Sequence, residues 1–250
     1  NIIIENNQNY KNLSPKEAIN CTCGSEYEYS KTFYSHLGHY FCPYCKNKRP
    51  KVKYEADCKI DNDCILINLD DKTFKSNLTG TYNAYNLLGA ICVGLELDID
   101  EKIIQKALDN YNAVFGRNEK IKINKTSVNI NLIKNPTGAS EVLNCIKDKK
   151  GTKLLLILND NYADGRDVSW IWDANFELIS NFANDIYVSG KRAYDMALRL
   201  KYANIDTKLI HIEPDIKKAF ELSIKSCNNN YELNILPTYT ALLELKKIVN

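Results

Sequence analysis

The 250-residue chain is poor in several features that mark other classes of protein. Glycine (10) and proline (6) are few, which excludes collagen-like sequences and chains dominated by flexible linkers. No stretch approaches the roughly 18 consecutive apolar residues of a membrane span, and the polar start lacks a signal peptide's basic and apolar segments. Positive residues exceed negative ones by only two, whereas duplex-binding proteins carry a clustered basic excess. These absences predict a cytoplasmic protein with no transmembrane segment and no nucleic-acid partner.

Methionine is scarcer still. Met196 is the only one, and the chain begins with Asn1, so we expect further residues to precede Asn1 in the natural gene product. Hydrophobic residues make up 44% of the sequence and charged residues 26%, values that are usual for globular proteins. At roughly 150 residues per domain, the length predicts one large domain or two modest ones.

Cysteine, by contrast, is frequent, and four of the nine cysteines form two close pairs separated by 18 residues. They are Cys21, Cys23, Cys42 and Cys45. Such spacing is typical of a zinc ribbon, in which four thiolates surround one tetrahedral ion. A closed four-sulfur site has no position for a reactive water, so the predicted zinc is structural. Because the first pair is CxC and not CxxC, His36 or His39 as substitute ligands, and reduced thiols without metal, stay open as alternatives.

The pattern of apolar residues changes near residues 112 to 117. Before that point it predicts strands over 51–58 and 63–69 and helices over 82–97 and 98–111, the second capped by Asp98 with Glu101. Beyond it, strands over 128–133, 153–158, 185–188, 207–212 and 231–235 alternate with helices over 139–147, 176–182, 193–201, 214–226 and 238–249. This alternation predicts parallel βαβ units. We therefore predict an α/β protein with domains at 1–113 and 114–250, and the ribbon, about 18–50, as an insertion.

The richest loop follows the apolar strand over residues 153–158. Residues 159–173 hold four aspartates, Arg166, and both tryptophans of the chain. Functional groups of doubly wound sheets lie on loops at the carboxyl ends of strands. Tryptophans beside carboxylates favour an ordered, partly desolvated loop, in which a carboxylate binds Mg²⁺ or accepts a proton. The alternative is a solvated acidic turn whose aspartates only cap the turn around Trp170.

Three shorter polar motifs accompany this loop, and each alone indicates only a turn or a helix start. They are Thr79-Gly80-Thr81-Tyr82-Asn83, Phe115-Gly116-Arg117-Asn118-Glu119 and Lys134-Asn135-Pro136-Thr137-Gly138. More specific are Trp170-Ile171-Trp172-Asp173 in the loop and Leu236-Pro237-Thr238-Tyr239-Thr240 near the end. Taken together with the cysteine ribbon, these motifs make the chain resemble the MurT family of lipid II isoglutaminyl synthase subunits, which are relatives of the Mur peptide ligases.

The resemblance implies the end of an ATP-binding Mur ligase central domain with its inserted zinc ribbon, followed by a Rossmann-like Mur ligase C-terminal domain. It implies an ATP-dependent amide ligase of peptidoglycan biosynthesis. The α-carboxylate of D-glutamate in the lipid II stem peptide is activated as an acyl phosphate, and ammonia from a GatD-type glutaminase subunit displaces the phosphate to give D-isoglutamine. The implied cofactors are ATP and Mg²⁺ besides zinc, and the implied place of action is the cytoplasmic face of the membrane.

Site residues also follow from the resemblance. The implied nucleotide contacts are Asn83 on the adenine side, Arg117 near the ribose or the domain hinge, and Asn135. The implied acceptor of the ammonium proton is Asp164, with Asp167 and Asp173 in support. The phosphate-binding Gly-Lys-Thr motif of the family's central domain is missing from these residues, so we do not expect this chain alone to use ATP.

Two other functions stay open on the sequence. A zinc-ribbon interaction or adaptor module without catalysis would explain the cysteines and the α/β body. Another Mur-type or folylpolyglutamate-type ligase would keep the Gly116-Arg117-Asn118-Glu119 and Asn135-Pro136 elements, but it would leave the ribbon and the Trp-Ile-Trp loop unexplained. A Gly-Lys-Thr loop in the upstream coding sequence would favour the ligase.

Overall fold

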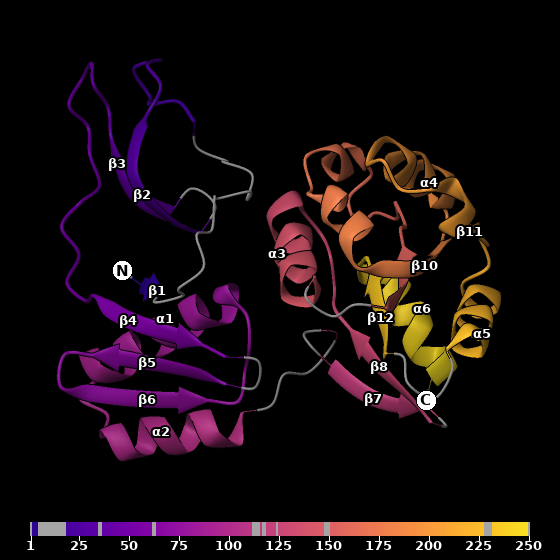
Figure 1. Cartoon of the computed structure of the whole chain (residues 1–250). Coiled ribbons are helices and arrows are strands. Elements are labelled where there is room, and N and C mark those ends of the chain that lie inside the picture. The colour runs from indigo at the N-terminus through magenta and orange to yellow at the C-terminus, as the bar shows by residue number, and fades with distance from the viewer. Residues whose placement is uncertain are drawn as a thin grey trace. The chain divides into compact units, whose positions relative to one another are not determined.

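The computed structural model of the chain describes residues 2–4, 19–34, 37–61, 64–111, 116, 119–123, 125–147, 151–227 and 232–249. These residues belong to two compact units, residues 1–112 and 113–250, which we call unit 1 and unit 2 (Figure 1). Both units combine helices with a β-sheet, so the predicted α/β class is confirmed. Within the described ranges, no helix combines the length and apolar character needed to cross a membrane.

Unit 1 contains a four-stranded sheet in the order β1–β4–β5–β6. The strands are Ile2–Ile4, Ala56–Ile60, Ile65–Leu69 and Lys72–Ser76. β1 pairs with β4 in parallel, and the other pairs are antiparallel. Buried and exposed residues alternate along β4 to β6, as expected when one face of a sheet packs on helices. Those helices are α1 (Thr81–Glu96), on β4 and β5, and α2 (Glu101–Asn110), on β6.

The helix boundary in unit 1 differs from the prediction by two residues. Asp100 caps α2, because its side chain accepts a hydrogen bond from the backbone N–H of Lys102 at 2.8 Å. Asp98 instead ends α1: its φ is +54°, and the N–H of the following Ile99 returns to the carbonyl of Gly94 at 3.0 Å. This closure is a Schellman motif, which places one residue in the left-handed region.

The ribbon segment, by which we mean the described residues between 19 and 50, is a separate small sheet in unit 1 (Figure 1). It pairs β2 (Glu28–Tyr34) with β3 (Leu37–Phe41) in an antiparallel hairpin. The strand predicted from residue 51 begins only at Ala56. Lys53 and Tyr54 instead hydrogen-bond to Glu96 at the end of α1, which keeps this stretch out of the sheet.

Unit 2 is built on a six-stranded sheet in the order β11–β10–β9–β12–β8–β7. In chain order the strands are Glu119–Ile123, Thr126–Ile130, Thr152–Ile157, Ala183–Ser189, Ile210–Ile212 and Glu232–Pro237. All neighbours are parallel except β7 and β8. The predicted parallel βαβ units are therefore confirmed, with an antiparallel edge strand added.

Helices cover both faces of this sheet. α3 (Pro136–Ile146), the 3₁₀ helices η1 (Ser169–Trp172) and η2 (Phe176–Asn181), and α4 (Ala193–Tyr202) pack on the face that carries Leu154 and Leu156 of β9. α5 (Ile216–Ser226) and α6 (Tyr239–Val249) pack on the face that carries Leu155 and Ile157. Because both faces are covered, every residue of β9 is buried.

Two local predictions in unit 2 are confirmed only in part. The stretch predicted as a helix over 176–182 is the 3₁₀ helix η2. The strand predicted over 207–212 is half as long, because Thr207–Leu209 forms a further 3₁₀ turn, η3, and only Ile210–Ile212 pairs as β11. Asp206 stabilises that turn by accepting a hydrogen bond from the N–H of Lys208 at 2.9 Å, a cap that competes with strand formation.

The strand order determines where a site can form. β12 is last in the chain but lies between β9 and β8. The segment after β9 returns on the face of α3 and α4, whereas α6, which follows β12, lies on the opposite face. Adjacent strands whose connections leave to opposite faces open a crevice at their carboxyl ends, where α/β proteins bind ligands.

Gly190 directly follows β10 and packs closely against the chain at the end of β9. Its φ is +90°, and a Cβ there would lie 2.6 Å from the carbonyl oxygen of Leu158. We expect Gly190→Ala to lower the free energy of unfolding of unit 2 by about 1–3 kcal/mol. Urea denaturation followed by tryptophan fluorescence measures it, because both tryptophans lie in unit 2.

Gly89 provides the matched control. It lies exposed in α1 with nothing near the position of an added Cβ, so Gly89→Ala should stabilise unit 1 by about 0.5–1 kcal/mol, as measured by circular dichroism. An unchanged urea midpoint for Gly190→Ala would contradict the close packing described here.

Candidate functional site

Asp164 joins the loop after β9 to the first turn of α6. Its Oδ1 accepts a hydrogen bond from the backbone N–H of Thr240 at 2.7 Å. Its Oδ2 accepts from the hydroxyl of Thr240 and from the backbone N–H of Asn161, the latter at 3.1 Å. The unpaired N–H groups and positive dipole of a helix start favour a carboxylate there. The predicted catalytic Asp164 thus lies half-buried at the carboxyl ends of the paired strands β9 and β12.

Two asparagines complete this arrangement. The Asn159 amide donates to the hydroxyl of Thr240 at 3.2 Å and to Glu244 at 3.3 Å, and the Asn161 amide donates to the same hydroxyl at 2.8 Å. Lys191 contacts both, through its backbone N–H to Asn159 Oδ1 at 3.0 Å and its Nζ to Asn161 Oδ1 at 2.5 Å. We call Asn159, Asn161, Asp164, Lys191 and Thr240 the crevice network.

The asparagines of the crevice network are functional candidates that the sequence did not single out. Asn159 is 2% exposed although its side chain is polar, and buried polar groups of this kind are retained only with hydrogen-bond partners. Its position directly after the apolar run of residues 154–158 was the available signal. Thr240 lies in the Leu-Pro-Thr-Tyr-Thr motif, and its hydroxyl, which donates once and accepts twice, is fully used.

The other two predicted aspartates do not join the crevice network. Asp167 is exposed, and its Oδ1 accepts from the N–H of Ser169 at 2.8 Å, so it stabilises the start of η1. That backbone hydrogen bond lowers the pKa of Asp167 below its usual value. Asp173 is exposed and follows the end of η1, where its N–H donates to the carbonyl of Trp170 at 3.2 Å. Of the three aspartates, the structure brings only Asp164 to the crevice.

Arg199 of α4 holds the turn that carries the tryptophans, and no sequence motif marked it. The side chain is buried. Its Nε donates to the carbonyl of Ile171 at 2.9 Å, and its Nη2 donates to the carbonyl of Ala174 at 2.8 Å and to Glu177 at 2.7 Å. The guanidinium also lies over the ring of Trp172, 5.7 Å from its centroid. Since a buried charge needs such partners, Arg199 fixes the position of the turn.

We predict that Arg199→Ala loosens this turn. Two backbone carbonyls and Glu177 lose their donor, so the free energy of unfolding of unit 2 should fall by about 2 kcal/mol or more. Tryptophan emission should also move to longer wavelength, because Trp170 and Trp172 are the only tryptophans. Lys201→Ala, an exposed change on the same helix, should stay within about 0.5 kcal/mol of wild type. If the two substitutions had equal effects, Arg199 would not be the residue that fixes the position of this turn.

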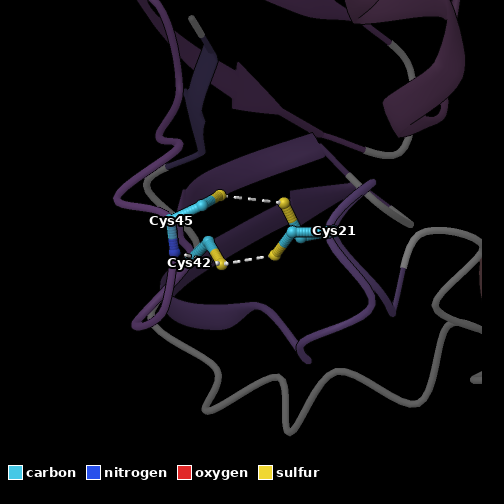
Figure 2. Close-up of side chains that lie close together, drawn as sticks. Cys21, Cys42 and Cys45 are labelled. Carbon is cyan, nitrogen blue, oxygen red and sulfur yellow. Dashed lines mark hydrogen bonds between the residues drawn. The ribbon is translucent and has the colours of Figure 1, made fainter.

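In unit 1 the four predicted cysteines converge on one point. The sulfurs of Cys21 and Cys45 lie 3.5 Å apart, those of Cys23 and Cys42 lie 3.5 Å apart, and all four lie within 4.8 Å of one another. Figure 2 shows the labelled side chains of Cys21, Cys42 and Cys45 turned toward this centre. Four bonds of about 2.3 Å to a tetrahedral zinc would separate the sulfurs by about 3.8 Å. The cluster can therefore hold a metal ion, and within the described residues it includes no histidine.

Two tight turns present these sulfurs. In the first, the N–H of Gly24 donates to the carbonyl of Cys21 at 2.8 Å, and Gly24 has a φ of +90°. In the second, the N–H of Lys46 donates to the carbonyl of Cys42 at 3.0 Å. The CxC spacing thus still brings its two sulfurs into the cluster. The backbone of Cys23 donates to the Cys21 sulfur and, with Tyr27, lowers the pKa of Cys21 to about 5, which favours the thiolate that metals bind.

Two of the three predicted nucleotide contacts belong to different units. Asn83 is buried in α1 of unit 1, where its amide donates to the carbonyl of Thr79 at 2.7 Å. Asn135 belongs to unit 2 and caps α3, because its Oδ1 accepts from the N–H of Gly138 at 2.7 Å. Arg117 lies outside the described residues. In the structure, both asparagines stabilise helix starts, and their contact with nucleotide stays a prediction.

Glu119, close to Arg117 in the chain, has a clear structural role. It accepts a hydrogen bond from the backbone N–H of Gly116 at 3.0 Å and pairs with Lys246 of α6. Burial raises the pKa of Glu119, but the hydrogen bonds from Lys246 and Gly116 outweigh burial and hold it below the usual value. The ion pair thus attaches the start of unit 2 to the helix whose other end carries Thr240.

Comparison with known proteins finds similarity to MurT ligases. Residues 132–242 match the family described as the MurT ligase C-terminal domain. The chain is 36% identical over 230 residues to the MurT subunit of lipid II isoglutaminyl synthase (glutamine-hydrolyzing) of Staphylococcus aureus strain COL, covering 91% of this chain and 52% of that protein. It is 33% identical over 239 residues to the same-named subunit of Streptococcus pneumoniae strain R6, covering 93% and 53%. The predicted resemblance to MurT is confirmed.

A solved structure extends the likeness to both units. A pseudomurein peptide ligase type C from Methanothermus fervidus is similar with a TM-score of 0.70 and 22% identity, over 94% of this chain and 49% of that one. The fold is therefore similar to that of Mur ligase domains. The chain spans about half the length of the curated relatives it matches.

Proposed function

We propose, since residues 132–242 belong to the MurT ligase C-terminal family, that this chain is part of the ligase subunit of a glutamine-hydrolysing lipid II isoglutaminyl synthase. Its reaction is the ATP-dependent amidation of the α-carboxylate of D-glutamate in the stem peptide. The relatives at 36% and 33% identity support this. The single observation that carries it at the level of geometry is the half-buried carboxylate of Asp164 in the crevice at the carboxyl ends of β9 and β12.

The chemistry explains why a carboxylate is useful there. ATP converts the substrate carboxylate into an acyl phosphate, whose carbonyl carbon reacts with neutral ammonia, whereas ammonia in neutral water is mostly protonated. A carboxylate beside the reacting carbon binds ammonium and takes one of its protons. The ammonia so formed then attacks the carbonyl carbon, the C–N bond forms and phosphate leaves. Such general-base assistance contributes roughly 10²- to 10⁴-fold to a rate.

Asp164 has the capacity for this role. A carboxylate offers about four lone-pair sites, and three are used by the N–H and hydroxyl of Thr240 and the N–H of Asn161. One site on Oδ1 is left for ammonium. The three hydrogen bonds also fix the orientation of the carboxylate before substrate binds, which is the preorganisation that catalysis needs. We assign Asp167 and Asp173 supporting roles in the same loop.

The rest of the reaction needs parts that this chain does not supply. No Gly-Lys-Thr phosphate loop occurs in these residues, so ATP with Mg²⁺ would be held in part by the other half of the subunit. Asn83, Arg117 and Asn135 are proposed to contact the nucleotide from this half. The ammonia would come from a glutaminase subunit of the GatD type docked on unit 2. The complex would act on lipid II at the cytoplasmic face of the membrane.

Substitution of Asp164 tests the proposed role. In the complete two-subunit enzyme, Asp164→Asn should reduce both glutamine-dependent and ammonium-dependent amidation by roughly 10²- to 10⁴-fold. The loss should appear with both nitrogen sources because the proton is taken at the amidation step. Product formation is measured by mass spectrometry, with complex formation checked by size-exclusion chromatography. Near wild-type rates with both nitrogen sources would exclude Asp164 from the mechanism.

Two further variants separate chemistry from capping. Thr240→Val removes the hydroxyl that donates to Asp164 but keeps the charge of the carboxylate, so it should cost much less activity than Asp164→Asn. Asp206→Asn, which alters a capping aspartate at η3 outside the crevice network, should leave the rate unchanged. If Thr240→Val and Asp164→Asn lost activity equally, Asp164 would be a structural cap only.

For the cysteine cluster we propose one structural zinc ion per chain, held by Cys21, Cys23, Cys42 and Cys45. Four sulfur ligands suit zinc, and a site closed by four protein ligands contributes to folding and not to catalysis. The separations of the sulfurs support this assignment, and they exceed the roughly 2.05 Å of a disulfide bond. With zinc bound, the two turns are joined at the base of the ribbon segment.

Elemental analysis of protein purified without added metal should find about one zinc per chain. Removal of zinc with a chelator should lower the melting temperature, because metal binding and folding of such sites are coupled. Cys23→Ser should lose the zinc, whereas Cys64→Ser, at a cysteine outside the cluster, should keep it. Protein without zinc in which all four clustered thiols react freely with an alkylating agent would contradict the proposal.

A further inference from the structure

A groove of about 480 Å³ lies on the ribbon segment, apart from the cysteine cluster. Its lining residues belong to the hairpin of β2 and β3 and to the chain that follows. Its lining residues are Glu28, Tyr29, Ser30, His39, Tyr40, Phe41, Lys48 and Arg49. Aromatic rings and two permanent cations therefore face one cavity, a combination that the structural zinc does not explain.

Arg49 at this groove has unused donor capacity. Its Nη1 donates to the carbonyl of Gly38 at 2.9 Å, but its Nε is buried and has no acceptor among the described residues. A buried donor without a partner is uncommon in folded proteins. The Nε edge of a guanidinium matches the oxygens of a phosphate, and Lys48 adds a second positive charge. An oxygen of a bound oxyanion would thus accept the hydrogen bond that Nε of Arg49 has to donate.

The tyrosine rings that line the groove suit the uncharged part of a ligand. The rings of Tyr29 and Tyr40 have centroids 6.2 Å apart, and Tyr27 packs on Tyr40 at 4.9 Å. Packed tyrosines present a rigid, amphipathic surface that covers the apolar face of a ring while their hydroxyls hydrogen-bond. Glu28, the only acidic side chain among the lining residues, can accept hydrogen bonds from ligand hydroxyls. A ring that carries hydroxyls, attached to an anion, fits this lining.

We propose that this groove binds a glycosyl diphosphate, with phosphate oxygens at Lys48 and Arg49 and the sugar ring against Tyr29 and Tyr40. The inference rests on the proposed function, since lipid II is a disaccharide joined to a lipid through a diphosphate. The groove would hold the head of the substrate. The ribbon segment then contributes to substrate binding as well as to folding.

The test titrates the chain with UDP-N-acetylglucosamine, a soluble glycosyl diphosphate, by isothermal calorimetry. Inorganic pyrophosphate and N-acetylglucosamine are titrated separately. We expect the glycosyl diphosphate to bind at least about tenfold more tightly than either part, because only it engages both halves of the groove. The double variant Lys48→Gln, Arg49→Gln should weaken that binding at least about tenfold. Equal binding by pyrophosphate would overturn the assignment of the tyrosines to a sugar.

A matched double variant controls for charge. Lys31→Gln, Lys46→Gln removes the same two charges from the ribbon segment at residues outside the groove lining, and it should bind like wild type. Zinc content and circular dichroism confirm that both variants fold. Absence of binding by wild type, or the same loss in both double variants, would overturn the proposal.

The complete enzyme separates this inference from the proposed function. If wild type amidates lipid II and the Lys48→Gln, Arg49→Gln variant does so with an unchanged KM for lipid II, the groove proposal fails while the function stands. If wild type does not amidate lipid II, the proposed function fails. If the groove proposal and the proposed function are both correct, the Lys48→Gln, Arg49→Gln variant should show a raised KM for lipid II with little change in kcat.

Discussion

The hydrogen bonds from Thr240 to Asp164 join the two halves of unit 2. The carboxylate belongs to the loop after β9, and its partner begins the helix after β12, 76 residues later in the chain. Because β12 lies beside β9, these segments meet at one edge of the sheet while their helices cover opposite faces. Asn159, Asn161 and Lys191 add bonds around the same hydroxyl. These hydrogen bonds therefore hold the carboxylate of Asp164 in one orientation.

Three further contacts in unit 2 fix the elements that surround Asp164 and Thr240. Arg199 attaches the tryptophan turn to α4, the ion pair of Glu119 and Lys246 attaches the start of unit 2 to α6, and Gly190 allows close approach to Leu158. Each contact joins a loop or strand end to an element whose other face lies in the core. The loop after β9 can thus carry charged side chains and still be ordered.

The sequence was informative wherever a local pattern decides the structure. The apolar run of β9, the alternation of strands and helices, and the paired cysteines all predicted what the structure contains. It could not reveal the insertion of β12 between β9 and β8, because strand order depends on packing between distant segments. Arg199 gave no signal, since one arginine in an amphipathic helix is ordinarily solvated. Likewise, the sequence ranked Asp164 above Asp167 and Asp173 without showing the contacts of any of them. The structure distinguishes them, because Asp164 contacts Thr240 whereas Asp167 accepts a hydrogen bond at the start of η1.

The central claim is that the crevice between β9 and β12 is where the substrate reacts. Hydrogen–deuterium exchange of the complete ligase, with and without ATP and lipid II, tests it most directly. We expect the backbone amides of residues 159–173 and of the first turn of α6 to exchange more slowly when both ligands are bound. Protection confined to other parts of the chain, with these amides unchanged, would contradict it.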